Sequence, residues 1–295
     1  MAGKITLTFL GTGSTIPSPK RAHPAIVLST LGENLLFDCG EGTQVKLQEA
    51  GINPMRISRI FITHFHPDHF LGLPGLVSSL ELCGRTEPLE IFSPKGAAGK
   101  LSALVKLCNG GRLPKYLIDF RKVPLSSKPI EISRGDRQSI FSCKTSHHIP
   151  AVGYSFVERD SFHLIPEKLP EKLKKPKALP KIKPEKNPEY FSVEKGRKIT
   201  YSGDTRFSEG IVRLAEGSDI LIHEATFPCD KSEKAKEYCH STPETAAQVA
   251  LKARAKKLIL THFSRRISDI KEQEAAARKL FPETFCAEDL QVFEL

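Results

Sequence analysis

The 295-residue sequence contains no apolar run that approaches the roughly 18 residues needed to cross a bilayer as a helix. The segment after Met1 enters an alternating strand pattern at Ile5, with no secretory leader before it. These two absences predict a cytoplasmic protein without a membrane span. With 39% hydrophobic residues the chain can bury a full core, as one large α/β domain or as two ordinary ones.

CxxC pairs are also absent, and the seven cysteines are scattered along the chain. That pattern favours reduced thiols over a disulfide framework or a cysteine zinc site. The formal net charge is +10, because lysine and arginine outnumber the acidic residues. Such an excess favours a polyanionic partner such as nucleic acid, although many basic proteins bind none.

Glycine is missing between Gly153 and Gly196, an interval of unusual composition. Residues 167–198 carry eleven lysines and arginines against five glutamates, and prolines recur at 166, 170, 176, 180, 184 and 188. The prolines forbid a regular helix, and so much lysine forbids a core. A solvated linker and a stiff basic arm that reaches for phosphates both remain open. We expect one domain over residues 1–295, with residues 159–198 inserted as an arm.

Elsewhere, short apolar runs alternate with helical patterns, which predicts an α/β fold. Polar residues follow several strand ends, and that edge of an α/β sheet is where active sites gather. One helix is expected after Ser241 and Glu244, which match an S-x-x-E capping box around Pro243. This places His240 just outside a helix N-terminus.

The densest cluster of such residues is Thr63-His64-Phe65-His66-Pro67-Asp68-His69, directly after the apolar run 57–62. Neutral imidazoles and a carboxylate are ligands that Zn²⁺ and similar metals prefer. Fold requirements alone hardly explain three histidines and an aspartate within six residues. The segment predicts a metal site with more ligands than one closed tetrahedral ion needs.

His147, Asp204 and His262 also follow apolar strands. Any one of them alone would more often be structural. Together with the four residues of the motif they make seven candidate ligands, which suit two ions with one shared carboxylate and an open solvent position. The sequence therefore predicts a two-metal hydrolase.

These residues carry a resemblance to the metallo-β-lactamase superfamily, whose fold is a four-layer αββα sandwich. Within it the chain resembles the ribonuclease Z family, the tRNA 3′-processing endonucleases. The narrower resemblance depends on further segments, which are Phe9 to Gly13, Tyr201 to Arg206, Leu221 to Phe227, His240-Ser241-Thr242, and the spacing from His147 to Gly153-Tyr154.

The resemblance implies two Zn²⁺ per subunit, with Mn²⁺ as a substitute. His64, His66 and His147 would bind one ion, Asp68, His69 and His262 the other, and Asp204 would bridge them. The ions would activate a water that attacks phosphorus, with Asp68 orienting it or accepting its proton. Glu224 and His240 resemble the pair that protonates the leaving ribose 3′ oxygen. A helix N-terminus lowers the pKa of a histidine, so Glu224 would have to favour the charged ring.

The resemblance also implies precursor tRNA as substrate and a homodimer in which the arm of one subunit grips the tRNA cut by the other. Candidate substrate-binding residues are Arg21 in the loop from Pro17, and Lys172, Lys174, Lys175 and Lys177 in the arm. The chain departs from the family pattern in its glycine-free arm and at Ala22, where asparagine is usual. The alternatives are a phosphodiesterase for small or cyclic nucleotide esters and an RNA-binding protein that has lost its metals.

Overall fold

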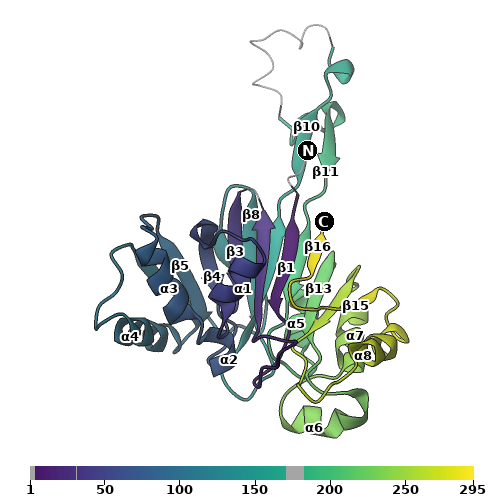
Figure 1. Ribbon diagram of the computed structural model, residues 1–295. Helices are drawn as coiled ribbons and strands as arrows, with labels where there is room; N and C mark the ends of the chain where they lie inside the picture. The colour runs from purple at the N-terminus through teal and green to yellow at the C-terminus, as the bar shows by residue number, and fades with distance from the viewer. Residues whose placement is uncertain (1–3, 31, 171–182) are drawn as a thin grey trace.

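The computed structural model describes residues 4–30, 32–170 and 183–295. Two seven-stranded sheets pack against each other, and helices cover the outer face of each sheet (Figure 1). The expected αββα sandwich is thereby confirmed. No helix among the described residues is long and apolar enough to span a membrane. All seven cysteines are free, as expected for reduced thiols.

The first sheet is built almost entirely from the N-terminal half of the chain. Its strands, in spatial order, are β16 (Val292–Glu294), β1 (Thr6–Gly11), β2 (Ala25–Thr30), β3 (Glu33–Phe37), β4 (Ile57–Phe61), β5 (Leu89–Pro94) and β6 (Ile118–Val123). The helices of this half are α1 (Thr43–Glu49), α2 (Pro67–Phe70), α3 (Leu73–Leu82) and α4 (Ala98–Cys108). Strands β3 to β6 run parallel, so their carboxyl ends meet at one edge.

The second sheet comes from the C-terminal half. Its strands, in spatial order, are β15 (Thr284–Cys286), β14 (Leu258–Thr261), β13 (Ile220–Glu224), β12 (Lys198–Tyr201), β9 (Val152–Glu158), β8 (Gln138–Lys144) and β7 (Ile130–Arg134). The helices are α5 (Glu209–Leu214), α6 (Ser232–Glu237), α7 (Pro243–Lys252) and α8 (Ile270–Arg278). Strands β12 to β15 are parallel, which gathers a second set of carboxyl ends.

Three apolar clusters correspond to the three interfaces between the four layers. The central cluster joins both sheets, with Phe9 and Phe61 from the first and Phe156 and Ile222 from the second. A second cluster packs α1, α3 and α4 on the first sheet, and a third packs α5, α7 and α8 on the second. The inner strands alternate their side chains between two of these interfaces, so both faces are buried and their sequences are short, nearly continuous apolar runs.

Two short strands, β10 (Ser161–Leu164) and β11 (Phe191–Glu194), pair with each other and stand clear of both sheets (Figure 1). They belong to residues 159–198, the segment expected to form an arm, and their pairing was not predicted. This segment connects the end of β9 at Glu158 to the start of β12 at Lys198, and these two strand ends are neighbours. Residues 171–182 lie outside the described part of the chain.

Three further details differ from the sequence prediction. Strands β6 and β15 were not expected, because β6 has only two buried residues and β15 has only three residues. The capping box at Ser241 and Glu244 is wrong by one position. Thr242 is the N-cap of α7 and accepts from the Thr245 N–H, whereas Ser241 Oγ donates to the Thr205 carbonyl.

Candidate metal centre

The seven predicted ligands meet where the strands of the two sheets end. His64 and His66 follow β4, and the four-residue helix α2 carries Asp68 and His69. The other three follow strands of the second sheet: His147 comes after β8, Asp204 after β12 and His262 after β14. Residues more than 190 positions apart in sequence thus lie within one small volume.

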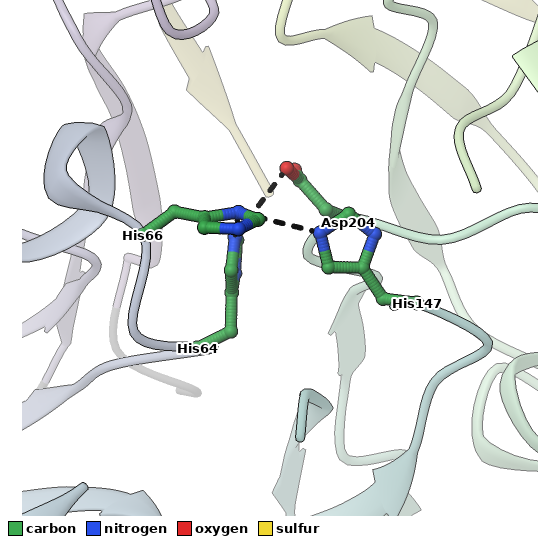
Figure 2. Close-up of side chains that lie close together, drawn as sticks. All are labelled: His64, His66, His147 and Asp204. Carbon is green, nitrogen blue, oxygen red and sulfur yellow. Dashed lines mark hydrogen bonds and ion pairs between the residues drawn. The ribbon is translucent and has the colours of Figure 1, made fainter. Parts of the chain in front are cut away.

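One group consists of His64, His66, His147 and Asp204, whose ligand atoms all lie within 4.8 Å of one another. The side chains of these residues converge from both sheets (Figure 2). His66 Nδ1 lies 2.9 Å from His64 Nε2 and 3.3 Å from His147 Nε2. Asp204 Oδ2 lies 3.5 Å from His64 Nε2.

Asp68, His69 and His262 form the second group. Asp68 Oδ2 lies 3.5 Å from the Nε2 atom of each of the two rings. Asp204 faces this group too, since its Oδ2 is 3.5 Å from His69 Nε2 and its Oδ1 is 3.4 Å from His262 Nε2. The Asp204 carboxylate therefore lies between both groups, where a shared ligand would stand.

The donor set passes two tests for metal ions. Donors about 2.0–2.1 Å from a tetrahedral zinc lie about 3.3–3.4 Å apart, which matches most of the separations given above. In addition, several buried polar atoms have no hydrogen-bond partner among the described residues, namely Asp68 Oδ1 and Oδ2, His69 Nε2, Asp204 Oδ1 and His262 Nε2. Buried atoms of this kind are costly unless something binds them.

A second set of residues orients the rings. His69 Nδ1 lies 2.8 Å from Asp38 Oδ2 and His147 Nδ1 lies 3.1 Å from the Cys239 carbonyl. These oxygens only accept hydrogen bonds, so each ring carries a proton on Nδ1 and turns Nε2 inward.

Two threonines do the same for His64 and His262. Thr63 Oγ1 donates to Asp38 and lies 3.0 Å from His64 Nδ1. Thr226 Oγ1 donates to Glu224 Oε2 and lies 2.8 Å from His262 Nδ1. Because each hydroxyl already donates its hydrogen bond to a carboxylate, each hydroxyl oxygen accepts a hydrogen bond from the Nδ1–H group of the histidine ring.

The protonation states of the first group suit metal binding. Burial lowers the pKa of His64 and His147, and it lowers the pKa of His66 to about 4, so these rings are neutral at neutral pH. For Asp204, burial opposes ionisation, but the neighbouring rings of His262, His69 and His64 outweigh it and hold its pKa well below the usual range.

Asp68 and His69 in the second group are charged before metal binds. Burial opposes the ionisation of Asp68, but His69 and His262 lower its pKa nonetheless. Burial also opposes the charged ring of His69, yet carboxylates of Asp204, Asp38 and Asp68 hold its pKa well above normal. A metal ion bound by His69 would therefore release a proton.

Glu224 and His240 form a close pair beside the ligands. His240 Nδ1 lies 2.7 Å from Glu224 Oε1, and Glu224 is 1% exposed. Glu224 also accepts hydrogen bonds from the backbone N–H groups of Thr205, Thr226 and Ser241. Although burial disfavours the charged imidazole, the Glu224 carboxylate raises the pKa of His240 to about 9. The Glu224 carboxylate therefore favours the charged form of the His240 ring.

Asp38 is a site residue that the sequence analysis missed. It is fully buried and accepts hydrogen bonds from the Thr63 N–H, the Thr63 hydroxyl and the Tyr201 hydroxyl, besides its contact with His69. Its φ of 56° is unusual for a residue other than glycine, as is the 61° of His262. The available signal was its place directly after an apolar strand, β3, since the three distant ligands also follow apolar strands.

The predicted substrate-binding residues are not part of this cluster. The Arg21 guanidinium donates to the Ile267 carbonyl at 2.9 Å and lies over the Phe263 ring at 5.6 Å. The Arg21 side chain thus packs against residues that follow His262 in the sequence. Lys172, Lys174, Lys175 and Lys177 lie outside the described residues.

The two facing sheets, with a histidine–aspartate cluster at their shared edge, define the class of metallo-β-lactamase-fold proteins. A family model described as a beta-lactamase superfamily domain matches residues 170–263. Another, described as anti-Pycsar protein Apyc1, matches residues 5–157. The metal motif after β4 lies in the second of these matches.

Full-length similarity specifies the family. Ribonuclease Z of Methanothermobacter thermautotrophicus is 39% identical, with 98% of this chain and 96% of the relative covered. Ribonuclease Z of Bacillus cereus is also 39% identical, covering 97% of each. The crystal structure of human tRNase Z, short form, superimposes with a TM-score of 0.74 at 33% identity, covering 98% of each chain. The chain belongs to the ribonuclease Z family.

Proposed function

We propose that this protein is a zinc-dependent endoribonuclease that removes the 3′ trailer from precursor tRNA and leaves a 3′-hydroxyl on the tRNA. The observation that carries the proposal is the pairing of two facing ligand groups with a charged His240 beside them. The names of the relatives supply the substrate, since ribonuclease Z and tRNase Z are the proteins that the chain resembles over nearly its whole length.

In this proposal His64, His66 and His147 would hold one Zn²⁺, Asp68, His69 and His262 would hold another, and Asp204 would be shared by the two. Mn²⁺ is a possible substitute. When bound, the ions activate water and neutralise charge on the phosphate oxygens.

Two side chains of the protein would accept and donate the protons of the reaction. Asp68 Oδ2 faces His69 and His262, while Oδ1 has no hydrogen-bond partner among the described residues. That second oxygen is free to orient the attacking water or accept its proton. On the other side, His240 carries a proton at neutral pH because Glu224 stabilises the imidazolium. His240 donates that proton to the leaving 3′ oxygen, which is a poor leaving group without it.

The position of the arm supports a homodimer. His64 pairs with Ala151, the residue directly before β9, whereas the arm begins after Glu158 at the other end of that strand. A strand of seven residues spans about 23 Å at ~3.3 Å per residue. The arm therefore leaves the sandwich at the end remote from its own ligand cluster (Figure 1). A second subunit would bring an arm to tRNA bound at this site.

We further propose that residues 1–295 form one domain with residues 159–198 as a tRNA-binding insertion. The central apolar cluster supports this, because it draws on strands from both halves of the chain. A cytoplasmic location remains a prediction from the sequence.

Incubation with a 3′-extended precursor tRNA, followed by mapping of both ends of the cut, tests the proposed function. We expect a tRNA ending in a 3′-hydroxyl and a trailer beginning with a 5′-phosphate. Chelation should abolish cleavage, and added Zn²⁺ or Mn²⁺ should restore it. Tight tRNA binding without cleavage, in protein that takes up neither Zn²⁺ nor Mn²⁺ when these ions are added, would favour the alternative of an RNA-binding protein that has lost its metals.

A further inference from the structure

Beside the proposed proton donor lies an aromatic pair, Phe227 and Tyr238, which the proposed mechanism does not use. The two ring centroids are 6.0 Å apart, with an angle of 27° between the ring planes. Phe227 is also 6.0 Å from the ring of His240. Exposure increases outward, from 13% for the His240 side chain to 57% for Tyr238. The pair thus extends from the metal centre to the protein surface.

The same backbone contacts that hold the metal centre also hold these rings. The Phe227 N–H donates to the Ser241 carbonyl and the His240 N–H donates to the Ala235 carbonyl. Between Tyr238 and His240, Cys239 adopts a φ of 57° and offers its carbonyl to His147 Nδ1 at 3.1 Å. The ring pair is therefore fixed in register with both the proton donor and a proposed ligand.

The chemistry of the site determines which nucleotide would meet these rings. A general acid at His240 donates to the 3′ oxygen that leaves, so the ribose carrying that oxygen lies against His240. The base attached to that ribose is then within reach of Phe227, whose ring centroid lies 6.0 Å from that of His240. Unpaired RNA bases bind proteins largely by stacking on aromatic side chains.

The neighbouring surface carries equal numbers of exposed lysines and acidic residues, the acidic ones being Asp230, Glu233 and Glu237. The helix α6 and the turn before it expose Lys231, Lys234 and Lys236. Lys231 pairs with Asp230 and Lys236 with Glu233, whereas Lys234 belongs to no ion pair recorded among the described residues. Lys234 is therefore the lysine of this segment that is available to a nucleotide phosphate.

We propose that Phe227 and Tyr238 form a stacking subsite for the base of the last tRNA nucleotide, the one that keeps the new 3′-hydroxyl. The inference rests on the proposed function, since it takes His240 as the donor to that oxygen.

The test combines a change in the enzyme with a change in the RNA. Wild-type protein and the Tyr238→Ala variant each cleave a precursor tRNA with an intact or abasic nucleotide directly 5′ of the cut. Base stacking predicts a loss of about 5- to 150-fold in kcat/KM for either change alone. The two changes together should cost no more than about 2-fold beyond the larger single loss, because both remove one contact.

Three controls sharpen the comparison. Tyr238→Phe keeps the ring and should cleave like wild type. Leu251→Ala removes another apolar side chain that is 57% exposed, and it should leave cleavage unchanged. An abasic nucleotide directly 3′ of the cut should show independent, multiplicative losses with Tyr238→Ala.

Multiplicative losses at the 5′ position would overturn the stacking subsite, and so would an absence of loss on either single change. These outcomes differ from failure of the proposed function, in which the wild-type protein would not cleave the intact precursor at all.

Discussion

His240 lies between a buried carboxylate and the ligand cluster, and it could serve either as a proton donor or as a ligand. Its Nδ1 atom is 2.7 Å from Glu224 Oε1 but 4.0 Å from Asp204 Oδ2. The hydrogen bond from Nδ1 to Glu224 leaves Nε2 available for either function, and Asp204, His240 and His262 have ligand atoms within 4.8 Å of one another, so an experiment has to distinguish the two.

The leaving group distinguishes these two functions of His240. We expect His240→Ala to lower the rate of precursor cleavage by about 10²- to 10⁴-fold, the usual contribution of a general acid. Hydrolysis of a 4-nitrophenyl phosphodiester should fall far less, because 4-nitrophenolate leaves without a proton. Metal content, measured by elemental analysis, should not change. Loss of metal from the variant would instead make His240 a ligand.

Asp38 is expected to act through His69. The Asp38 carboxylate orients the His69 ring and raises the basicity of that ring, and asparagine at this position would do neither. Asp38→Asn should therefore weaken metal binding by about 10- to 100-fold. Competition with a chromogenic chelator measures this affinity, and urea unfolding of the metal-free protein measures stability separately. The control is Asp119→Asn, an exposed residue paired with Arg121 on β6. An unchanged affinity with lowered stability would make Asp38 structural only.

At the scale of elements, the arm distinguishes a tRNA nuclease from a phosphodiesterase of small esters. Removing residues 166–189 keeps the paired strands β10 and β11 but deletes the lysine-rich part. Precursor cleavage should be lost while hydrolysis of a small phosphodiester stays nearly intact. If both activities survive equally, the arm is a linker.

The lysines of the arm should determine how binding depends on salt. Replacing Lys172, Lys174, Lys175 and Lys177 by alanine should reduce the slope of log Kd against log salt by as much as about 3–4. The size of the reduction depends on how many lysine–phosphate contacts are lost. The charge-matched control replaces exposed lysines of the first half, which are Lys106, Lys115, Lys122 and Lys128. Equal effects of the two sets would show a general charge effect.

The start of helix α7 shows that a capping motif does not by itself determine which residue is the N-cap. Ser241 and Glu244 satisfy the S-x-x-E pattern, yet Thr242 and Thr245 occupy the equivalent positions in α7. The reason is tertiary, because Ser241 is held by Thr205 and its N–H donates to Glu224. Helix α7 consequently starts one residue later, and Ser241 belongs to the surroundings of the proton donor.

At the scale of the whole molecule, a homodimer with arms acting in trans makes a complementation prediction. One subunit type lacks residues 166–189, and the other carries Asp204→Ala and has no functional ligand cluster. Neither alone should cleave precursor tRNA efficiently, but mixed dimers should regain cleavage, because one site and one arm are complete. A mixture that forms mixed dimers by mass measurement without regaining activity would contradict the trans arrangement.

The linear chain determined the donor set and the α/β architecture. His64, His66, Asp68 and His69 stand within six residues, and the strands before His147, Asp204 and His262 are marked by apolar runs that need no tertiary context. Parallel strands end at one edge, so sequence-distant ligands were expected to meet there.

Only the tertiary structure decided how those residues are held. Asp38 could not be recognised as the partner of His69, because that contact joins residues brought together by packing of α2 against the end of β3. The aromatic pair beside His240 likewise depends on the turn at Cys239 and on contacts with Ser241. The physical reason is that the residue types of the ligands can be recognised in short segments of the sequence, whereas the orientation and protonation of these side chains depend on buried neighbours from distant segments.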